Sequence, residues 1–304
     1  MSPTTTPVSE AFASGTPDPT GGEHIPTALA SGVLRPLGRL NTASNVTLLC
    51  EVDGGDGLRA VYKPVRGEAP LWDFPDGTLA GREVAAYRIS EALGWGIVPP
   101  TILRDGPVGP GMVQRWIDTD DLEDPAAPDD ADDPADTADT DDAGGPKLDP
   151  VDLCPAGEIP AGWIPILEAV DQHDRPIVLV HADLPELRRM AVFDVLINNA
   201  DRKGGHVLRD ASGRIFGIDH GVTLHSRNKL RTVLWGWAGT PIDPETVADI
   251  RRLVDRIDNG LGEELDEYLT EAEVAALWMR ASELVETPVM PLPPSSRPIP
   301  WPAF

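Results

Sequence analysis

Residues 193–206 have the sequence FDVLINNADRKGGH, and GIDHG follows at residues 217–221. Each stretch places one carboxylate, Asp201 or Asp219, at the end of an apolar segment, and the two lie eighteen positions apart. Between them, residues 206–209 and 215–218 predict two short strands around a turn. A hairpin of this size can bring both carboxylates to one rim. Such a pair is typical of phosphoryl transfer, in which one carboxylate orients or deprotonates the acceptor hydroxyl and the other holds magnesium.

The segments around this pair predict strands with one helix first and mostly helices afterwards. Strands are expected over residues 47–52, 58–63 and 112–117, the first two as an antiparallel hairpin around a glycine-rich turn. Helices are expected over residues 82–93, 184–198, 244–257 and 270–285. Gly94 is a natural stop for the first helix, and Thr270 with Glu273 forms a capping-box pattern at the last. The expected fold class is α+β in two lobes.

Composition divides the chain further. The formal net charge is −25, and the segment from Asp118 to Asp149 holds fourteen acids and one base. So negative a chain disfavours nucleic acids and anionic membranes as partners, because phosphates are repelled. The predicted parts are a disordered tail (1–28), an N-lobe (29–117), an acidic disordered insertion (118–150), a C-lobe (151–287) and a proline-rich segment (288–304). The insertion is a candidate surface for a protein partner.

Two cysteines without a pairing pattern fit a reducing compartment. Residues 1–22 lack the basic and apolar regions of a secretory signal, and no apolar run is long enough to span a bilayer. These features predict a cytoplasmic protein without a transmembrane segment.

The two aspartate stretches resemble the catalytic and metal-binding loops of atypical kinases related to phosphatidylinositol 3- and 4-kinases, whose pattern is D-R-x-x-x-N followed by I-D-F-G. They are also similar to the secretory-pathway casein kinases, with F-D-x-L-x-x-N-x-D-R, and more loosely to HipA-type bacterial kinases. From about Leu34 to Phe304, outside the insertion, the chain most resembles an actinobacterial family related to the phosphatidylinositol kinases. The resemblance implies a bilobed protein-kinase-like fold with an N-terminal antiparallel sheet and one helix, and a mostly helical C-terminal lobe.

The resemblance also implies site residues. Asp201 is then the catalytic acid–base residue and Asp219 the metal ligand, while His206 stands where those kinases have a metal-binding Asn. Because magnesium prefers oxygen donors, this histidine leaves manganese open as the active ion. His220 replaces the aromatic residue of D-F-G.

Further residues are candidates for binding ATP. Lys63 ends a predicted strand and Glu83 begins the following helix, as in kinases, where such a lysine contacts the phosphates and pairs with the glutamate. Taken alone, the two are better explained as an exposed strand lysine and a first-turn glutamate favoured by the helix dipole, and it is the Asp201 and Asp219 stretches that favour the pair. Ser44 and Asn45, in a loop of small residues, can cover phosphates. Gln114 and Trp116 fall between the lobes, where adenine would lie.

Residues 225–237 hold the basic side chains Arg227, Lys229 and Arg231 together with two tryptophans. The cluster could bind an anionic or planar substrate, or its basic side chains could pair with the acidic insertion, and the sequence does not separate the two.

Four functions remain open. The leading one is an ATP- and magnesium-dependent phosphotransferase acting on a protein, lipid or small-molecule hydroxyl. The His206 substitution motivates a nucleotide-binding pseudokinase scaffold. Transfer of AMP and a metallohydrolase built on His206, Asp201, Asp219 and His220 complete the set.

Overall fold

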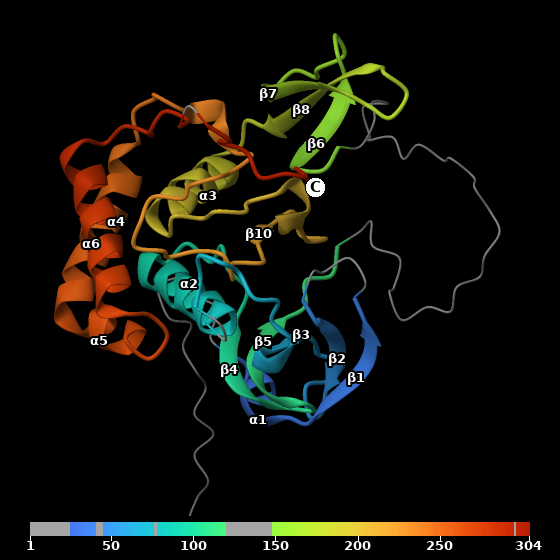
Figure 1. Cartoon of the computed structure of the whole chain (residues 1–304), viewed down its shortest axis with the longest axis vertical. Helices are drawn as coiled ribbons and strands as arrows, with labels where there is room; N and C mark the ends of the chain where they lie inside the picture. The colour runs from blue at the N-terminus through green and yellow to red at the C-terminus, as the bar shows by residue number, and fades with distance from the viewer. Residues whose placement is uncertain (1–24, 41–44, 76–77, 120–147, 295) are drawn as a thin grey trace, which may run out of the picture.

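The computed structural model describes residues 25–40, 45–75, 78–119, 148–294 and 296–304. It is an α+β structure with antiparallel sheets, so the predicted fold class is confirmed. Figure 1 shows the strands of the N-terminal lobe at the lower right and the helices of the C-terminal lobe at the left. The predicted tail, residue Ser44 and most of the acidic insertion lie outside the described residues.

The N-terminal lobe is built on a five-stranded antiparallel sheet with the strand order β1-β2-β3-β5-β4. Its strands are β1 (Leu34–Arg39), β2 (Leu48–Val52), β3 (Arg59–Pro64), β4 (Thr101–Gly106) and β5 (Gly109–Arg115). One core cluster lies within this lobe and joins the sheet to the short helix α1 (Thr27–Ser31). That helix begins one residue before the predicted end of the disordered tail, at Thr27. The predicted hairpin is present as β2 and β3, and β3 ends at Pro64.

Helix α2 (Leu79–Leu93) connects the two lobes. Its Ala80 and Val84 pack with Met112 of β5, whereas Ala85 and Ile89 belong to the large core of the C-terminal lobe. A helix that is buried on nearly all sides carries little amphipathic pattern, and this one buries even Arg82 and Glu83. It ends at Gly94 in the left-handed conformation, which confirms the predicted stop.

The C-terminal lobe consists of helices and two small sheets. Its helices are α3 (Pro185–Leu196), α4 (Pro244–Arg256), α5 (Gly262–Leu265) and α6 (Glu271–Glu286), with short turns at η2 (Gly204–His206), η3 (Trp235–Trp237) and a π-helical η4 (Ile257–Leu261). Strands β9 (Val207–Arg209) and β10 (Ile215–Gly217) form the predicted small hairpin. The predicted capping box of α6 is confirmed, since Thr270 N donates to Glu273 Oε2 over 3.0 Å.

A three-stranded sheet in this lobe was not predicted. Strands β6 (Val151–Pro155), β7 (Trp163–Val170) and β8 (Pro176–Ala182) pair antiparallel in the order β6-β8-β7. Prolines within or beside each strand weaken the local pattern, because proline cannot donate to a sheet ladder. The C-terminal lobe is therefore less purely helical than expected.

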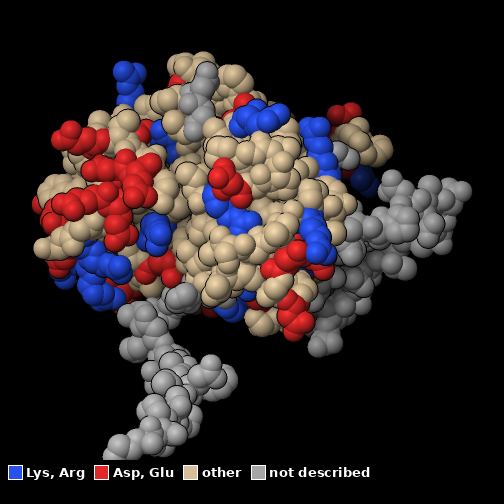
Figure 2. All heavy atoms as spheres, turned by 90° about the horizontal axis from the view of Figure 1, so that it is seen from below, with Lys and Arg blue, Asp and Glu red and all other residues tan. Residues whose placement is uncertain are grey.

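The surface is acidic beyond the insertion. Figure 2 shows acidic side chains gathered at the left, on the helical side of the molecule, where α5 and the start of α6 carry Glu263, Glu264 and Glu271. Cys50 and Cys154 are both buried and unpaired. Among the described helices, none is long and apolar enough to cross a membrane.

Candidate active site

Lys63 lies at the centre of the candidate site. From the end of β3, its Nζ reaches Glu83 Oε1 of α2 at 2.7 Å and Asp219 Oδ1 of the C-terminal lobe at 2.8 Å. Burial alone would lower the pKa of Lys63, but the carboxylates of Asp219 and Glu83 outweigh it and hold the pKa above its ordinary value. The lysine is therefore a permanent cation that links three segments far apart in the sequence.

Glu83 is fixed from both sides. Its second oxygen, Oε2, accepts a hydrogen bond from His220 N over 2.8 Å, so the carboxylate ties α2 to the loop that carries Asp219. Burial raises the pKa of Glu83, and the ammonium of Lys63 opposes that shift. Because only 2% of its side chain is exposed, Glu83 depends on Lys63 as its counter-ion.

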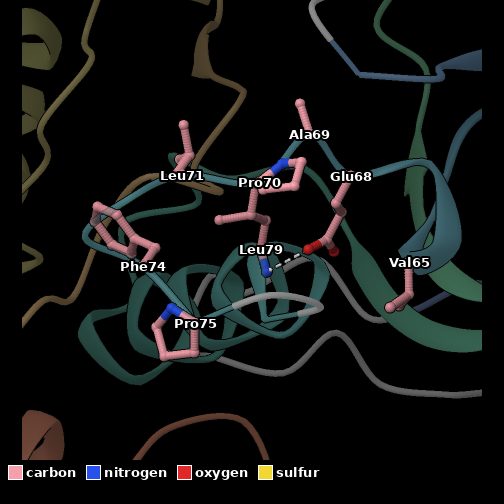
Figure 3. A pocket seen from close by; sticks show the side chains of 8 residues that line it. All are labelled: Val65, Glu68, Ala69, Pro70, Leu71, Phe74, Pro75 and Leu79. Atoms are coloured by element: carbon pink, nitrogen blue, oxygen red, sulfur yellow. Dashed lines mark hydrogen bonds between the residues drawn. The ribbon is translucent and has the colours of Figure 1, made fainter.

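Glu68 sets the position of α2 and was not predicted as a site residue. Its carboxylate accepts hydrogen bonds from the first amides of the helix, Leu79 N at 3.1 Å and Ala80 N at 2.9 Å. Figure 3 shows this carboxylate pointing at the helix start from the wall of a small hollow of about 200 Å³, which is lined by residues between 65 and 75 and by Leu79. A carboxylate at this end satisfies otherwise unpaired amides and complements the helix dipole. It thereby fixes Glu83, one turn further along.

Asp219 has a strained backbone. Its φ of 59° is in the left-handed region, which non-glycine residues adopt rarely and often at functional sites. The ammonium of Lys63 is the main reason that the pKa of Asp219 lies below its ordinary range, and burial opposes this. The side chain is 47% exposed, so the ionised carboxylate is accessible to a ligand as well as to Lys63.

Asp201 follows α3 on a loop whose amides are held in place. Its N donates to Asn199 Oδ1 over 3.0 Å, and Lys203 Nζ lies 3.9 Å from its Oδ2. Burial raises the pKa of Asp201 to about 6, with a further increase from the charge of Asp219 and a decrease from Lys203. A carboxylate with a raised pKa is a better proton acceptor near neutral pH than an ordinary aspartate.

Arg202 joins the Asp201 loop to helix α3 by a buried ion pair and to the Asp219 loop by hydrogen bonds. Arg202 Nη2 lies 2.9 Å from Asp194 Oδ1, with both side chains fully buried. The same guanidinium donates to Ile218 O over 3.1 Å and to His220 Nε2 over 2.7 Å. Arg202, which directly follows Asp201, is thus hydrogen-bonded to both neighbours of Asp219. Sequence reasoning named the D-R dipeptide but gave Arg202 no role.

His206 and Asp219 have a donor set that fits a divalent cation. His206 Nε2 lies 3.4 Å from Asp219 Oδ2. Two ligands of one small cation, each about 2.1 Å from it, are separated by roughly 3.0–3.4 Å at ordinary ligand angles. Burial lowers the pKa of His206 to about 4, so its imidazole is neutral and its lone pair is available near pH 7.

These two side chains would not complete a metal site alone. Within the described ranges, no group of three or more His, Cys, Asp and Glu side chains could hold a metal ion. Magnesium commonly keeps waters and takes one or two protein ligands together with substrate phosphates, so a pair of ligands suits it. His220 is no candidate ligand through Nε2, because an arginine only donates and that atom therefore accepts from Arg202.

The residues predicted around adenine and the phosphates contact other parts of the N-terminal lobe. Gln114 is buried in β5, where its Nε2 donates to Thr101 Oγ1 over 2.8 Å. Trp116 is half-buried at the end of that strand and lies beside Arg59, whose guanidinium carbon is 5.9 Å from the ring centre. Asn45 Oδ1 accepts from Ala69 N over 2.6 Å and so ties its loop to residues 65–71. Ser44 lies outside the described residues.

The basic cluster after Asp219 lies against the N-terminal lobe. Lys229 Nζ pairs with Asp73 Oδ2 at 2.5 Å and lies 5.2 Å from the ring centre of Trp72. The tryptophans of this stretch, Trp235 and Trp237, are buried and unable to stack on a planar substrate, so they do not support that one of the two roles left open for the cluster. Lys229 therefore has a partner within the folded lobes.

The fold and the site together define a two-lobed α+β protein in which a lysine–glutamate pair and two aspartate loops meet. The chain belongs to the family of protein Rv2133c from Mycobacterium tuberculosis, with which it shares 53% identity over 285 residues, covering 93% of this chain and 95% of the relative. No profile of a known protein family matches the chain.

Three solved structures are similar to the chain at low sequence identity. The Golgi casein kinase is 11% identical, with a TM-score of 0.47, over 87% of this chain and 78% of that one. The Helicobacter pylori proinflammatory kinase CtkA is 13% identical, with a TM-score of 0.41, over 85% and 93%. Hydra Fam20 is 14% identical, with a TM-score of 0.45, over 86% of each. At TM-scores below 0.5, these likenesses do not by themselves identify a fold or a function.

Proposed function

We propose that this protein is a phosphotransferase of the phosphatidylinositol 3-/4-kinase-related type, which uses ATP and magnesium and transfers phosphate to a hydroxyl group. The observation that carries the proposal is the position of Lys63 Nζ, within 2.8 Å of carboxylates from both Glu83 and Asp219. A cation held in this way can contact nucleotide phosphates while its glutamate partner keeps it oriented.

The roles follow from the geometry. Lys63 binds the phosphates, Glu83 orients Lys63, and Asp219 with His206 holds the metal ion. A magnesium ion held by Asp219 and His206 would supply positive charge that neutralises the phosphates. Asp201 accepts the proton of the acceptor hydroxyl as that oxygen bonds to the γ-phosphorus and the bond from this phosphorus to ADP breaks. Its pKa of about 6 leaves most of the carboxylate ionised at neutral pH, as this role requires.

The acceptor is a protein, a lipid or a small metabolite. A pseudokinase scaffold is the second candidate, and the specific feature that favours it is the imidazole of His206 beside Asp219, where magnesium would find an oxygen donor more suitable. AMP transfer uses the same nucleotide site and differs in the group that reaches the acceptor.

A thermal-shift screen with ATP, GTP and ADP, each with magnesium or manganese, tests the proposal on the wild type and on Asp219→Asn. Ligand binding raises the apparent stability by mass action, so a nucleotide-specific rise that requires Asp219 is expected. Release of ADP from bound ATP, lost in Asp201→Ala with binding retained, supports the phosphotransferase. Binding without turnover supports the scaffold, and a product heavier by AMP indicates AMP transfer. The absence of any nucleotide-dependent shift would refute all three.

A further inference from the structure

The segment after α6 returns across the candidate active site. Pro298 O accepts hydrogen bonds from Thr232 N over 3.0 Å and from Trp235 Nε1 over 2.9 Å. Further along, Ala303 O accepts from Gly204 N over 2.8 Å. In Figure 1 this segment, drawn in red, reaches the point marked C close to β6 and β10. Residues 298–304, here called the return segment, are therefore bonded to two loops of the site.

Phe304 closes the contact at Gly204. A Cβ atom added to Gly204 would lie 2.2 Å from Cε1 of the Phe304 ring, and real Cβ atoms essentially never come so close to another atom. The ring therefore occupies the space that any other residue at position 204 would need. Gly205, the next residue, has open space at the same point, so the close contact is specific to position 204.

Gly204 lies between the residues assigned to chemistry. It begins the turn η2, three residues after Asp201 and two before His206. On the other side of the loop, Thr232 pairs with Arg202 in a parallel bridge, and its hydroxyl donates to Asp194 Oδ2 over 2.9 Å. The return segment thus supports both the turn after Asp201 and the network that anchors Arg202.

We propose that Phe304 is a positioning residue, which acts through Gly204 to hold the loop of residues 201–206 in its working geometry. This inference rests on the proposed phosphotransferase function. The ring meets the chain at Gly204, whereas Lys63, Glu83 and Asp219 lie on other segments, so its effect falls on the loop that carries Asp201. A segment that only covered the core would affect stability without separating kcat from KM.

The test compares Phe304→Ala, Gly204→Ala and the double variant with the wild-type full chain. The control is Leu292→Ala, an exposed apolar truncation that precedes the return segment. The measurement is ADP release from magnesium–ATP, giving kcat and KM for ATP, with urea unfolding as the check on folding. The Phe304 side chain is 44% exposed, so its truncation is compatible with a folded protein.

We expect Phe304→Ala and Gly204→Ala each to lower kcat by about ten- to a hundredfold, because small misplacements of catalytic groups have effects of this size. KM for ATP should stay within about twofold, since Lys63, Glu83 and Asp219 lie on segments other than the loop of residues 201–206. The double variant should resemble Phe304→Ala, because both substitutions remove one contact and their effects do not add. The Leu292→Ala control should match the wild type.

Two failures are distinguishable. A wild-type chain that releases no ADP with either metal overturns the proposed function and the positioning role with it. A wild type that turns over ATP while Phe304→Ala keeps kcat within about twofold overturns the positioning role alone. Additive losses in the double variant would also overturn it, since they would mean that the ring and the glycine act independently.

Discussion

Asp201→Asn should stabilise the metal-free protein at neutral pH while abolishing its turnover. Burial raises the pKa of Asp201 from 3.8 to about 6, so the ionised carboxylate is less stable in the folded state than in the unfolded state. A shift of about two units corresponds to about 3 kcal/mol at most, at 1.36 kcal/mol for each unit. Because 36% of the side chain is exposed, solvent screening reduces this, and we expect a gain of about 1 kcal/mol.

The sign of the pH dependence follows from the raised pKa. The folded state binds the proton of Asp201 more tightly than the unfolded state, so the stability from this group is complete below about pH 4 and is lost as pH rises through about 6. The advantage of the asparagine variant should therefore be present in full at about pH 7.5 and reduced to about a third at about pH 4.5.

Urea unfolding at these two pH values, with chelator present, measures the difference in the free energy of unfolding. Asp210→Asn is the control with the opposite sign. Burial alone would raise the pKa of Asp210, but hydrogen bonds from Ser212 and Arg214 hold this pKa below its ordinary value. That variant should lose stability at neutral pH. An Asp201→Asn protein that is no more stable than the wild type at neutral pH would contradict a desolvated Asp201.

Three further substitutions test other parts of the site. Lys63→Met leaves the buried carboxylate of Glu83 without its cation and should lower the free energy of unfolding by about 3–5 kcal/mol in urea, with partial recovery when Glu83→Gln is added. Arg202→Met should have a loss of similar size, about 3–5 kcal/mol by the same assay, because Asp194 is fully buried; an unchanged midpoint would contradict this. His206→Asn supplies an oxygen donor beside Asp219, so the ratio of ADP release with magnesium to that with manganese should rise, and a fall would argue against His206 as a ligand.

Local patterns account for the elements that were predicted correctly. The hairpin of β2 and β3, the stop of α2 at Gly94 and the capping box of α6 each depend on residues within a few positions of one another. The three-stranded sheet β6-β8-β7 has no comparable local signature, because its prolines obscure the alternation that reveals a strand.

Long-range contacts account for what was missed in the site. Glu68 caps α2 from a separate loop, and Arg202 joins Asp194 to the backbone beside Asp219. No spacing in the sequence indicates either pairing. No local pattern indicates the burial of Trp235 and Trp237 either, since a tryptophan beside basic residues suits a surface and a core equally well.

The sequence alone determined the types of group available, their order along the chain and the local elements that carry them, because propensity, capping and turn chemistry act over a few residues. It placed Lys63 on a strand, Glu83 on a helix and the two aspartates around a hairpin. Only the tertiary structure decided that Lys63 lies within 2.8 Å of both Glu83 and Asp219, and that burial raises the pKa of Asp201. Distance and desolvation arise from the packing of α2 between the sheet and the C-terminal helices, which no local pattern encodes.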